Sequence, residues 1–399
     1  MPGVVFLVAE PMTTAPAPLP LPSGVRSRMV EGINGLAMHV LEAGFETPER
    51  PCVLLLHGFP ELAYSWRKVM PALAAAGYHV IAPDQRGYGR TTGWSADYDT
   101  DLRPFALLSI VRDALALVHA FGHRSVAAVV GHDFGSPVAA WCALTRPDVF
   151  RSVVMMSAPF GGAPVLPFDT ANGAPAAPAG GFARSMGAVL DALAALPRPR
   201  KHYQWYYSTR VANADMMGAP QGLSAFLRAY YHVKSADWAP NRPHRLAGIT
   251  AEELAKLPTY YIMDLAADMA ATVAPEMPSP EAVAACRWLP EADMAVYSGE
   301  YGRTGFQGGL QWYRCQTGGM FTPDLQLFAG RSIDVPATFI SGASDWGNYQ
   351  KPGDLEAMTS TACTRFEGVH FVDGAGHWVQ QEQPEVVNRL LLEFLARRR

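Results

Sequence analysis

The chain has 399 residues, of which 49% are hydrophobic and 17% are charged, and this composition excludes an intrinsically disordered chain. Its formal net charge of -4 gives no reason to expect nucleic acid or an anionic membrane surface as a partner. A small uncharged ligand is the better expectation, and the length favours one α/β core that carries an inserted domain.

The cysteines and the apolar stretches bear on the cellular compartment. The five cysteines form a scattered set without a C-x-x-C pair, which fits neither a zinc site nor a disulfide framework. The apolar run at residues 4–9 is short for a secretion signal, and no basic residue precedes it. No other stretch is both long and charge-free enough to cross a bilayer. We therefore predict a cytoplasmic protein with no membrane span, no metal and no cofactor.

The first part of the chain predicts a proline-rich leader followed by the start of a sheet. Residues 1–24 hold a run that alternates with proline, so we expect an extended segment with little order. A hairpin signal follows, since two strand patterns are joined through Gly32 and Gly35. A fully apolar strand, typical of a sheet covered on both faces, then ends at His57-Gly58-Phe59-Pro60. The expected strands are residues 26–31, 36–42, 51–56 and 79–82, and the expected helices are 63–75 and 105–121.

The sequence Gly131-His132-Asp133-Phe134-Gly135 lies between a buried-strand pattern at 124–130 and a helix pattern at 136–145. A strand-turn-helix of this kind strains its central residue, lifts that side chain above the sheet, and needs small flanking residues. Serine is common at the centre of such an elbow in hydrolases, and here it is Asp133. A carboxylate is ionised near neutral pH, so it needs no base to act as a nucleophile. Asp133 is therefore our candidate nucleophile, the alternative being an aspartate that caps the following helix.

A strand pattern at 153–156 is followed by a break in the alternation of strands and helices. Residues 161–181 are rich in proline, alanine and glycine, and the pattern beyond them is helical without sheet strands. Because strand and helix alternate elsewhere, we expect a mostly parallel sheet with its ligand site at the carboxyl ends of the strands. Strand patterns return at 335–340 and 370–372, and a helix at 384–396 closes the chain. The expected parts are a leader at 1–24, a core at 25–159 and 319–399, and a helical lid at 160–318.

Four motifs carry a resemblance to a known family. They are His57-Gly58-Phe59-Pro60, the Asp133 elbow, residues 305–314 with the sequence GFQGGLQWYR, and Gly376-His377-Trp378. In this order the chain resembles the soluble epoxide hydrolases over nearly all of residues 25–399. The resemblance implies an α/β-hydrolase fold with an inserted helical cap, and the conversion of an epoxide and water to a vicinal diol. One departure is Phe134, since the family commonly has tryptophan after the nucleophile, and it affects the shape of the pocket wall.

The resemblance implies two further catalytic residues, His377 and Asp345. His377 follows the last core strand on a glycine-rich loop, from which it can reach a nucleophile on another strand. A histidine, with an ordinary pKa of about 6.5, suits the role of general base toward water. Asp345 follows the seventh strand and would hold the imidazole tautomer. Asp373, on the same loop as His377, is the rival for that role.

Opening of an epoxide leaves an alkoxide, which a carboxylate nucleophile cannot protonate. Two neutral tyrosine hydroxyls can hydrogen-bond the epoxide oxygen and stabilise the developing charge. The resemblance assigns this role to Tyr313, in the 305–314 motif, and to Tyr203, which has Tyr206 and Tyr207 as close competitors. The alternative for these residues is aromatic packing within the lid.

Hydrolysis of an ester on the nucleophile would place negative charge on its side-chain oxygen. The backbone N–H groups of Phe59 and Phe134 are expected to form the oxyanion hole for that charge. The side chains of Phe59, Phe134, Trp312 and Trp378 are expected to contact a small hydrophobic epoxide. Pro60 is expected to fix its turn through a cis bond.

Three other functions are compatible with parts of this pattern. Haloalkane and fluoroacetate dehalogenases share the aspartate nucleophile, but they need a tryptophan or arginine after it to bind halide, and Phe134 supplies no such donor. A serine esterase needs a G-x-S-x-G motif, which is absent from the sequence. A non-catalytic protein of this fold would typically have lost the nucleophile or the histidine. The sequence indicates neither the particular epoxide nor the oligomeric state.

Overall fold

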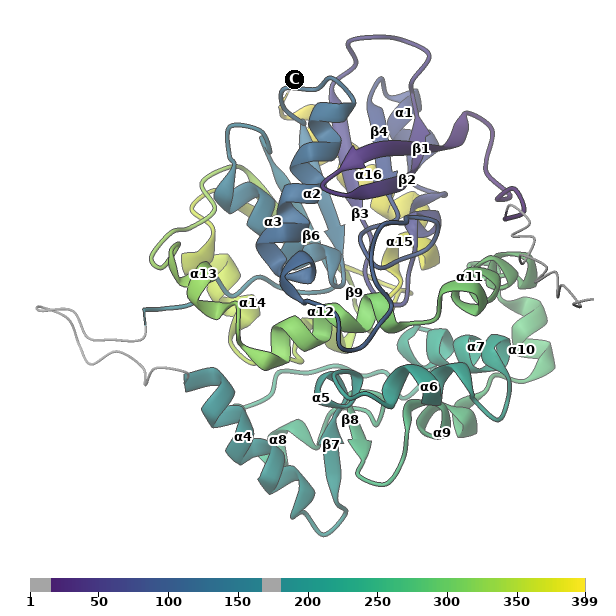
Figure 1. Cartoon of the computed structure of the whole chain (residues 1–399), viewed down its shortest axis with the longest axis vertical. Coiled ribbons are helices and arrows are strands. Elements are labelled where there is room, and N and C mark those ends of the chain that lie inside the picture. The colour runs from purple at the N-terminus through teal and green to yellow at the C-terminus, as the bar shows by residue number, and fades with distance from the viewer. Residues whose placement is uncertain (1–15, 167–180, 399) are drawn as a thin grey trace, which may run out of the picture.

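The computed structural model describes residues 16–166 and 181–398, which form a central sheet, helices on both of its faces, and a separate helical segment (Figure 1). The sheet has eight strands in the order β1-β2-β4-β3-β5-β6-β9-β10. The strands from β4 to β10 in this order are parallel, whereas β1 and β2 form an antiparallel hairpin at one edge. The bounds are β1 (Val25–Ile33), β2 (Leu36–Ala43), β3 (Cys52–Leu56), β4 (His79–Pro83), β5 (Ala128–His132), β6 (Val153–Met156), β9 (Ala337–Gly342) and β10 (Phe366–Val372).

Side chains of the central strands alternate between two hydrophobic cores, one on each face of the sheet. In β3, Leu54 and Leu56 belong to the core that contains α2 and α3, whereas Val53 and Leu55 belong to the core that contains α1 and α16. Both faces are covered, which explains the continuous apolar run of this strand and confirms the expected sheet flanked by helices. The helices and turns of this part are η1 (Ala63–Trp66), α1 (Met70–Ala75), η2 (Arg103–Phe105), α2 (Leu107–Ala120), α3 (Gly135–Thr145), η4 (Trp346–Asn348), α14 (Asp354–Ala357), η5 (Met358–Ala362), α15 (Val379–Glu382) and α16 (Pro384–Ala396).

Two of the expected helices are shorter than their sequence patterns. The helix expected at 63–75 is divided into the 3-10 turn η1 and the helix α1. Pro71 stands in the first turn of α1, where it lacks the N–H that a continuous helix would need. The helix expected from residue 105 begins at Leu107, because the residues before it form the 3-10 turn η2.

The chain leaves the sheet after β6 and returns to it at β9, and most of the described residues between them form helices (Figure 1). The expectation that this segment lacks strands was wrong, because β7 and β8 pair in a small antiparallel sheet. Strands of three residues are too short to show an alternating pattern, and Arg200 reinforces the pair by donating to the carbonyl of Ile262. Residues 167–180 of the proline-rich stretch lie outside the described residues. The elements are α4 (Gly181–Ala194), β7 (Arg200–His202), α5 (Tyr203–Tyr207), α6 (Ala212–Met217), α7 (Leu223–Lys234), α8 (Ala251–Leu254), β8 (Ile262–Asp264), α9 (Met269–Val273), η3 (Ala274–Glu276), α10 (Pro280–Ala285), α11 (Glu291–Thr304), α12 (Gln307–Gly318) and α13 (Thr322–Gln326).

The expected leader at 1–24 is described only from residue 16, since residues 1–15 lie outside the described residues. Before β1, the chain from residue 16 contacts the core: Tyr64 donates a hydrogen bond to the carbonyl of Pro20, and Arg90 donates one to the carbonyl of Ala17. Among the helices of residues 16–166 and 181–398, none is long and apolar enough to cross a membrane.

Candidate active site

Asp133 lies in the turn between β5 and α3 with a φ of 51°, a left-handed conformation that residues other than glycine seldom adopt. Its N–H donates a hydrogen bond of 3.1 Å to the carbonyl of Met156, in the neighbouring strand β6. The turn is too tight for larger neighbours, because a Cβ on Gly131 would lie 1.9 Å from the carbonyl oxygen of Gly135. The structure therefore contains the strained turn that the sequence predicts, with Asp133 at the carboxyl end of β5.

The two oxygens of the Asp133 carboxylate have different partners. Oδ1 accepts a hydrogen bond of 2.9 Å from the N–H of Phe59, in the loop after β3. Oδ2 lies 3.1 Å from Nε2 of His377. Burial opposes the charge on Asp133, yet the hydrogen bond and charge of His377 hold the pKa of this carboxyl well below its ordinary value. The carboxylate is thus ionised and held on both sides.

The loop that supplies the Phe59 N–H approaches the nucleophile closely. A Cβ on Gly58 would lie 2.4 Å from the Cβ of Asp133, so only glycine fits there. The peptide bond before Pro60 is cis, as the sequence predicts. Phe134, the second expected donor, begins the turn into α3, and among the described residues its N–H makes no hydrogen bond to Asp133. Of the two N–H groups expected to donate to the nucleophile, that of Phe59 does so among the described residues and that of Phe134 does not.

His377 bridges Asp133 and Asp345. Its Nδ1 lies 3.1 Å from each carboxylate oxygen of Asp345, which in turn accepts a hydrogen bond of 2.7 Å from the N–H of Gly347. Burial and the charge of Lys234 lower the pKa of His377, while Asp345 and Asp133 raise it, and the net shift is upward. The imidazole is therefore oriented by one carboxylate and points its other nitrogen at the second.

Asp373, the rival for the contact with His377, is exposed, and no hydrogen bond or ion pair within the described residues joins the two. The loop of His377 is held instead by Glu382, whose carboxylate accepts hydrogen bonds of 2.9 Å from the N–H groups on either side of the histidine. The N–H of His377 itself donates to the carbonyl of Lys234 at 2.8 Å. Sequence reasoning missed both anchors, because contacts of this kind leave no periodic pattern.

Glu61 and His132 form a fully buried pair behind the elbow, with 2.6 Å between Oε2 and Nδ1. Glu61 also accepts a hydrogen bond from the N–H of Gly58, and Nε2 of His132 lies 2.6 Å from the carbonyl oxygen of His377. The pair therefore connects the three loops that surround the nucleophile. In the sequence, only the positions of the two residues could have revealed this pair, since Glu61 follows the His57–Pro60 motif and His132 precedes the nucleophile.

Tyr203 and Tyr313 line the same cavity as Asp133 but come from the helical segment. Tyr203 begins α5 and Tyr313 lies in α12, with 6.0 Å between their ring centroids. The Tyr203 hydroxyl donates to Gln350 and accepts from Gln204, both at 3.2 Å, whereas the described residues offer the Tyr313 hydroxyl no hydrogen-bond partner. Burial raises the pKa of both tyrosines well above its ordinary value, so both hydroxyls are neutral donors.

The two competitors of Tyr203 lie elsewhere. The Tyr206 hydroxyl donates a hydrogen bond of 2.9 Å to Asp215, and Tyr207 is fully buried among other rings. Neither side chain is part of the cavity wall. The structure thus brings Tyr203, and not its neighbours, to the cavity that contains Asp133.

The cavity has a volume of about 480 Å³. Phe134 and Trp312 line it next to Asp133, with 5.2 Å between their ring centroids. The indole N–H of Trp312 donates to the carbonyl of Arg86 at 3.0 Å, so it is not free to bind a ligand. The apolar part of the remaining wall includes Phe105, Leu107, Ile110, Pro137, Trp141 and Phe160.

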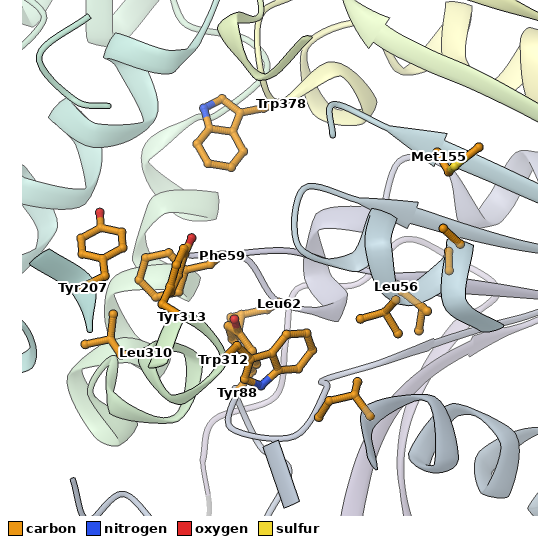
Figure 2. Close-up of a cluster of buried hydrophobic side chains, with 14 of the residues drawn as sticks. Leu56, Phe59, Leu62, Tyr88, Met155, Tyr207, Leu310, Trp312, Tyr313 and Trp378 are labelled. Atoms are coloured by element: carbon orange, nitrogen blue, oxygen red, sulfur yellow. The ribbon is translucent and has the colours of Figure 1, made fainter. Parts of the chain in front are cut away.

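Two other side chains expected to contact substrate do not form part of this wall. The Phe59 ring packs against Tyr313, with 5.5 Å between the centroids, and is nearly fully buried. Trp378 lies apart from that pair (Figure 2). Its ring stacks on that of Tyr231, with 4.3 Å between the centroids. Packing of these rings against the helical segment explains why they lie behind the wall and not in it.

The arrangement has a definite chemical capacity. An ionised carboxylate, backed by a histidine, lies in one cavity with two neutral phenols. Such a set can attack an electrophilic carbon, protonate the oxygen that leaves, and then activate water. Within the described residues, no group of histidine, cysteine and acidic side chains could hold a metal ion.

Comparisons with known proteins agree with this geometry. A family model described as alpha/beta hydrolase fold matches residues 51–384. Epoxide hydrolase B of Mycobacterium tuberculosis is 33% identical over 366 residues, which cover 91% of this chain and 96% of that protein. Epoxide hydrolase A of the same organism is 32% identical and covers 94% and 98%. The solved structure of an epoxide hydrolase from an endophytic Streptomyces is similar to this chain with a TM-score of 0.71, 32% identity, and coverage of 94% and 96%.

Proposed function

Since this chain belongs to the α/β-hydrolase fold family and is an epoxide hydrolase, we propose that it forms an alkyl ester on Asp133. A water molecule activated by His377 then hydrolyses this ester. The observation that carries the proposal is the pair of contacts on the Asp133 carboxylate, with a backbone donor on one oxygen and an imidazole at the other. Asp345 orients that imidazole.

In the first step, Oδ2 of Asp133 attacks an epoxide carbon, while Oδ1 keeps its hydrogen bond from the Phe59 N–H. The new ester C–O bond forms while the C–O bond of the epoxide breaks, and the departing oxygen becomes an alkoxide. Tyr203 and Tyr313 hydrogen-bond that oxygen and one of them gives it a proton. The tyrosinate left behind takes up a proton from solvent, so both phenols are neutral in the alkyl-enzyme, as their raised pKa values favour. Their position on the cavity wall beside Asp133 supports this role.

In the second step, His377 takes a proton from water as the water oxygen attacks Cγ of Asp133. Negative charge develops on Oδ1, where the Phe59 N–H already donates. A hydrogen-bond donor of this kind lowers the barrier by about 3 kcal/mol. We propose the Phe134 N–H as a second donor, engaged when the tetrahedral intermediate forms. Collapse of this intermediate expels the diol, which receives the proton held by His377. The proton that remains on the Asp133 carboxyl is released to solvent, because the pKa of this group is held well below its ordinary value, and the free carboxylate is restored.

We further propose that residues 160–318 are a cap, between core segments 25–159 and 319–399 and after a leader at 1–24. Support comes from the origin of the side chains, since the tyrosines reach the cavity from helices outside the sheet. The aromatic wall and the cavity volume suit a small hydrophobic epoxide. The cytoplasmic location stays a prediction from the sequence.

A single-turnover experiment in water enriched in oxygen-18, with enzyme in excess over epoxide, tests the mechanism. The new oxygen of the diol comes from Asp133, so the first diol released is expected to be unlabelled. Label is expected in Asp133, located by mass spectrometry of its peptide. A labelled first diol together with unlabelled Asp133 would show direct attack by water and exclude the ester.

A further inference from the structure

Lys234, the last residue of α7, is buried with 2% of its surface exposed. Its ammonium nitrogen is surrounded by aromatic rings and, within the described residues, takes part in no ion pair and no side-chain hydrogen bond. Ring faces attract a cation at distances up to about 6 Å, so the cage attracts the ammonium group without a carboxylate. The distances from Nζ to the ring centroids are 5.0 Å for Tyr261, 5.2 Å for Tyr230, 5.7 Å for Trp378, and 6.0 Å for Tyr203 and Tyr260.

The backbone of Lys234 fixes this cation relative to the catalytic histidine. Its carbonyl accepts the hydrogen bond from the N–H of His377, and a Cβ on Gly376 would lie 2.5 Å from the same carbonyl oxygen. The cage shares Trp378 with the histidine loop and Tyr203 with the cavity wall. The charge of Lys234 therefore acts on both Asp133 and His377.

Four side chains at this site carry a charge or can gain one. Esterification removes the charge of one of them, Asp133. In the free enzyme, Asp133 and Asp345 are negative, Lys234 is positive, and protonation of His377 makes the sum zero. Once Asp133 is an ester and both tyrosines are neutral again, the negative charge of Asp345 is already balanced by Lys234. Protonation of His377 would then leave a net positive charge in a buried site, which is unfavourable.

We propose that the Lys234 ammonium keeps His377 neutral, and so available as a base, once Asp133 has been esterified. This inference rests on the proposed ester mechanism. Lys234 touches no reacting atom and acts only through the effect of its charge on His377. It is therefore a positioning residue and not a catalytic one. The aromatic cage suits the role, because a carboxylate partner would cancel the field that the lysine exerts on the histidine.

The other groups that face His377 do not supply this effect. Asp345 favours the protonated imidazole, and Asp133 does so only while it is ionised. His132 packs on the His377 ring with 5.1 Å between centroids, but its own Nδ1 is paired with Glu61. Glu382 accepts hydrogen bonds from the N–H groups on either side of His377, and burial raises the pKa of this carboxyl to about 8, so it supplies no cation. Lys234 is thus the cation that opposes these carboxylates.

The test compares wild type with Lys234→Met, which keeps length and apolar bulk, and with Lys234→Arg, which keeps the charge. The alkyl-enzyme is formed by rapid mixing with excess enzyme, and its decay is followed by intact-protein mass spectrometry across about pH 5 to 9. The acid limb of the profile is the pH range in which the decay rate falls as the pH drops. For Lys234→Met we expect this limb to move up by about one pH unit. Decay at pH 6 should then be about tenfold slower than in wild type, while decay at pH 9 stays near wild type. Lys234→Arg is expected to retain the wild-type limb.

Lys201→Met is the matched control, because Lys201 also lies over a tyrosine ring, Tyr206 at 4.9 Å, but belongs to the short sheet of β7 and β8. It should leave the pH profile unchanged. An unchanged acid limb in Lys234→Met, or an equal shift in the Lys201 control, would overturn the proposal. If Lys234→Met does not fold, an acid limb in Lys234→Arg that moves up by a full unit despite the retained charge overturns it as well. Absence of any alkyl-enzyme in wild type and in His377→Gln would instead refute the ester mechanism, so the two failures are distinguishable.

Discussion

Gly308 of α12 lies against the backbone of Gly87 so closely that a Cβ on Gly308 would stand 2.0 Å from the carbonyl oxygen of Gly87. This contact seats the helix that carries Tyr313 on the loop after β4. Gly308→Ala should displace α12, lower the free energy of unfolding by about 1–3 kcal/mol, and slow ring opening. Thermal unfolding and stopped-flow kinetics measure the two effects. Gly318→Ala in the same helix is the control, since a Cβ there meets nothing within 4 Å.

We predict that His377 acts in the second step only. Asp133 is ionised in the free enzyme and needs no deprotonation, so His377→Gln should still open the epoxide and then accumulate the alkyl-enzyme. Intact-protein mass spectrometry after mixing with epoxide should show a mass increase equal to that of the substrate. A folded His377→Gln protein that forms no adduct would place the histidine in the first step.

The two steps should differ in their dependence on pH. Because the pKa of Asp133 is held well below its ordinary value, its nucleophilic form persists when the solution is acidified below neutrality. Ester hydrolysis needs neutral His377, so its rate should fall as pH drops and the imidazole is protonated. Pre-steady-state measurement of adduct formation and decay at several pH values should show a flat first step and a declining second one. A first step that declines in parallel would contradict the assignment.

Asp345 should support the second step more than its loop rival Asp373 does. Both carboxylate oxygens of Asp345 contact Nδ1 of His377, whereas Asp373 is exposed. Asp345→Asn should slow decay of the alkyl-enzyme by on the order of a hundredfold or more, since an amide stabilises the imidazolium poorly. Asp373→Asn, the same chemical change on the same side of the sheet, should leave the decay rate within about twofold of wild type. An equal slowing of alkyl-enzyme decay in the two variants would contradict the assignment of Asp345 as the residue that orients His377.

Much of the fold could be predicted because its signals are local. The apolar run of β3 reflects a strand buried on both faces, and the glycines around Asp133 reflect a turn in which a Cβ does not fit. His377 and Asp345 could be singled out because each follows a predicted core strand. The structure brings His377 to Asp133 and Asp345 to His377.

The features that sequence reasoning missed depend on contacts between distant residues. The pairing of β7 with β8 joins strands of three residues that lie some sixty positions apart, at Lys201 and Met263. The cage of Lys234 is assembled from α5, α7, the turn before β8 and the histidine loop, so no spacing in the sequence encodes it. The rings of Phe59 and Trp378 were expected in the cavity wall, and tertiary packing places them behind it.

The last prediction concerns the acids of the first step. An alkoxide has a far higher proton affinity than a halide, so epoxide opening should depend on the hydroxyls of Tyr203 and Tyr313, whereas halide release should not. Tyr203→Phe and Tyr313→Phe each delete one hydroxyl and keep the ring. Each should slow adduct formation by about tenfold or more, and the double variant should abolish it, because the remaining donor partly covers for the missing one. Tyr206→Phe is the control, since its hydroxyl donates to Asp215 away from the cavity.

The same variants separate this enzyme from a dehalogenase. A halide would need N–H donors beside the nucleophile, but Phe134 has none in its side chain and the indole N–H of Trp312 donates to the carbonyl of Arg86. Wild-type protein should therefore release no halide from haloalkanes or fluoroacetate, as measured by ion chromatography. The free energy of unfolding of Tyr313→Phe should stay close to that of wild type, because within the described residues the Tyr313 hydroxyl has no hydrogen-bond partner to lose. Halide release that persists in the double variant would make the two tyrosines structural and assign Asp133 to dehalogenation.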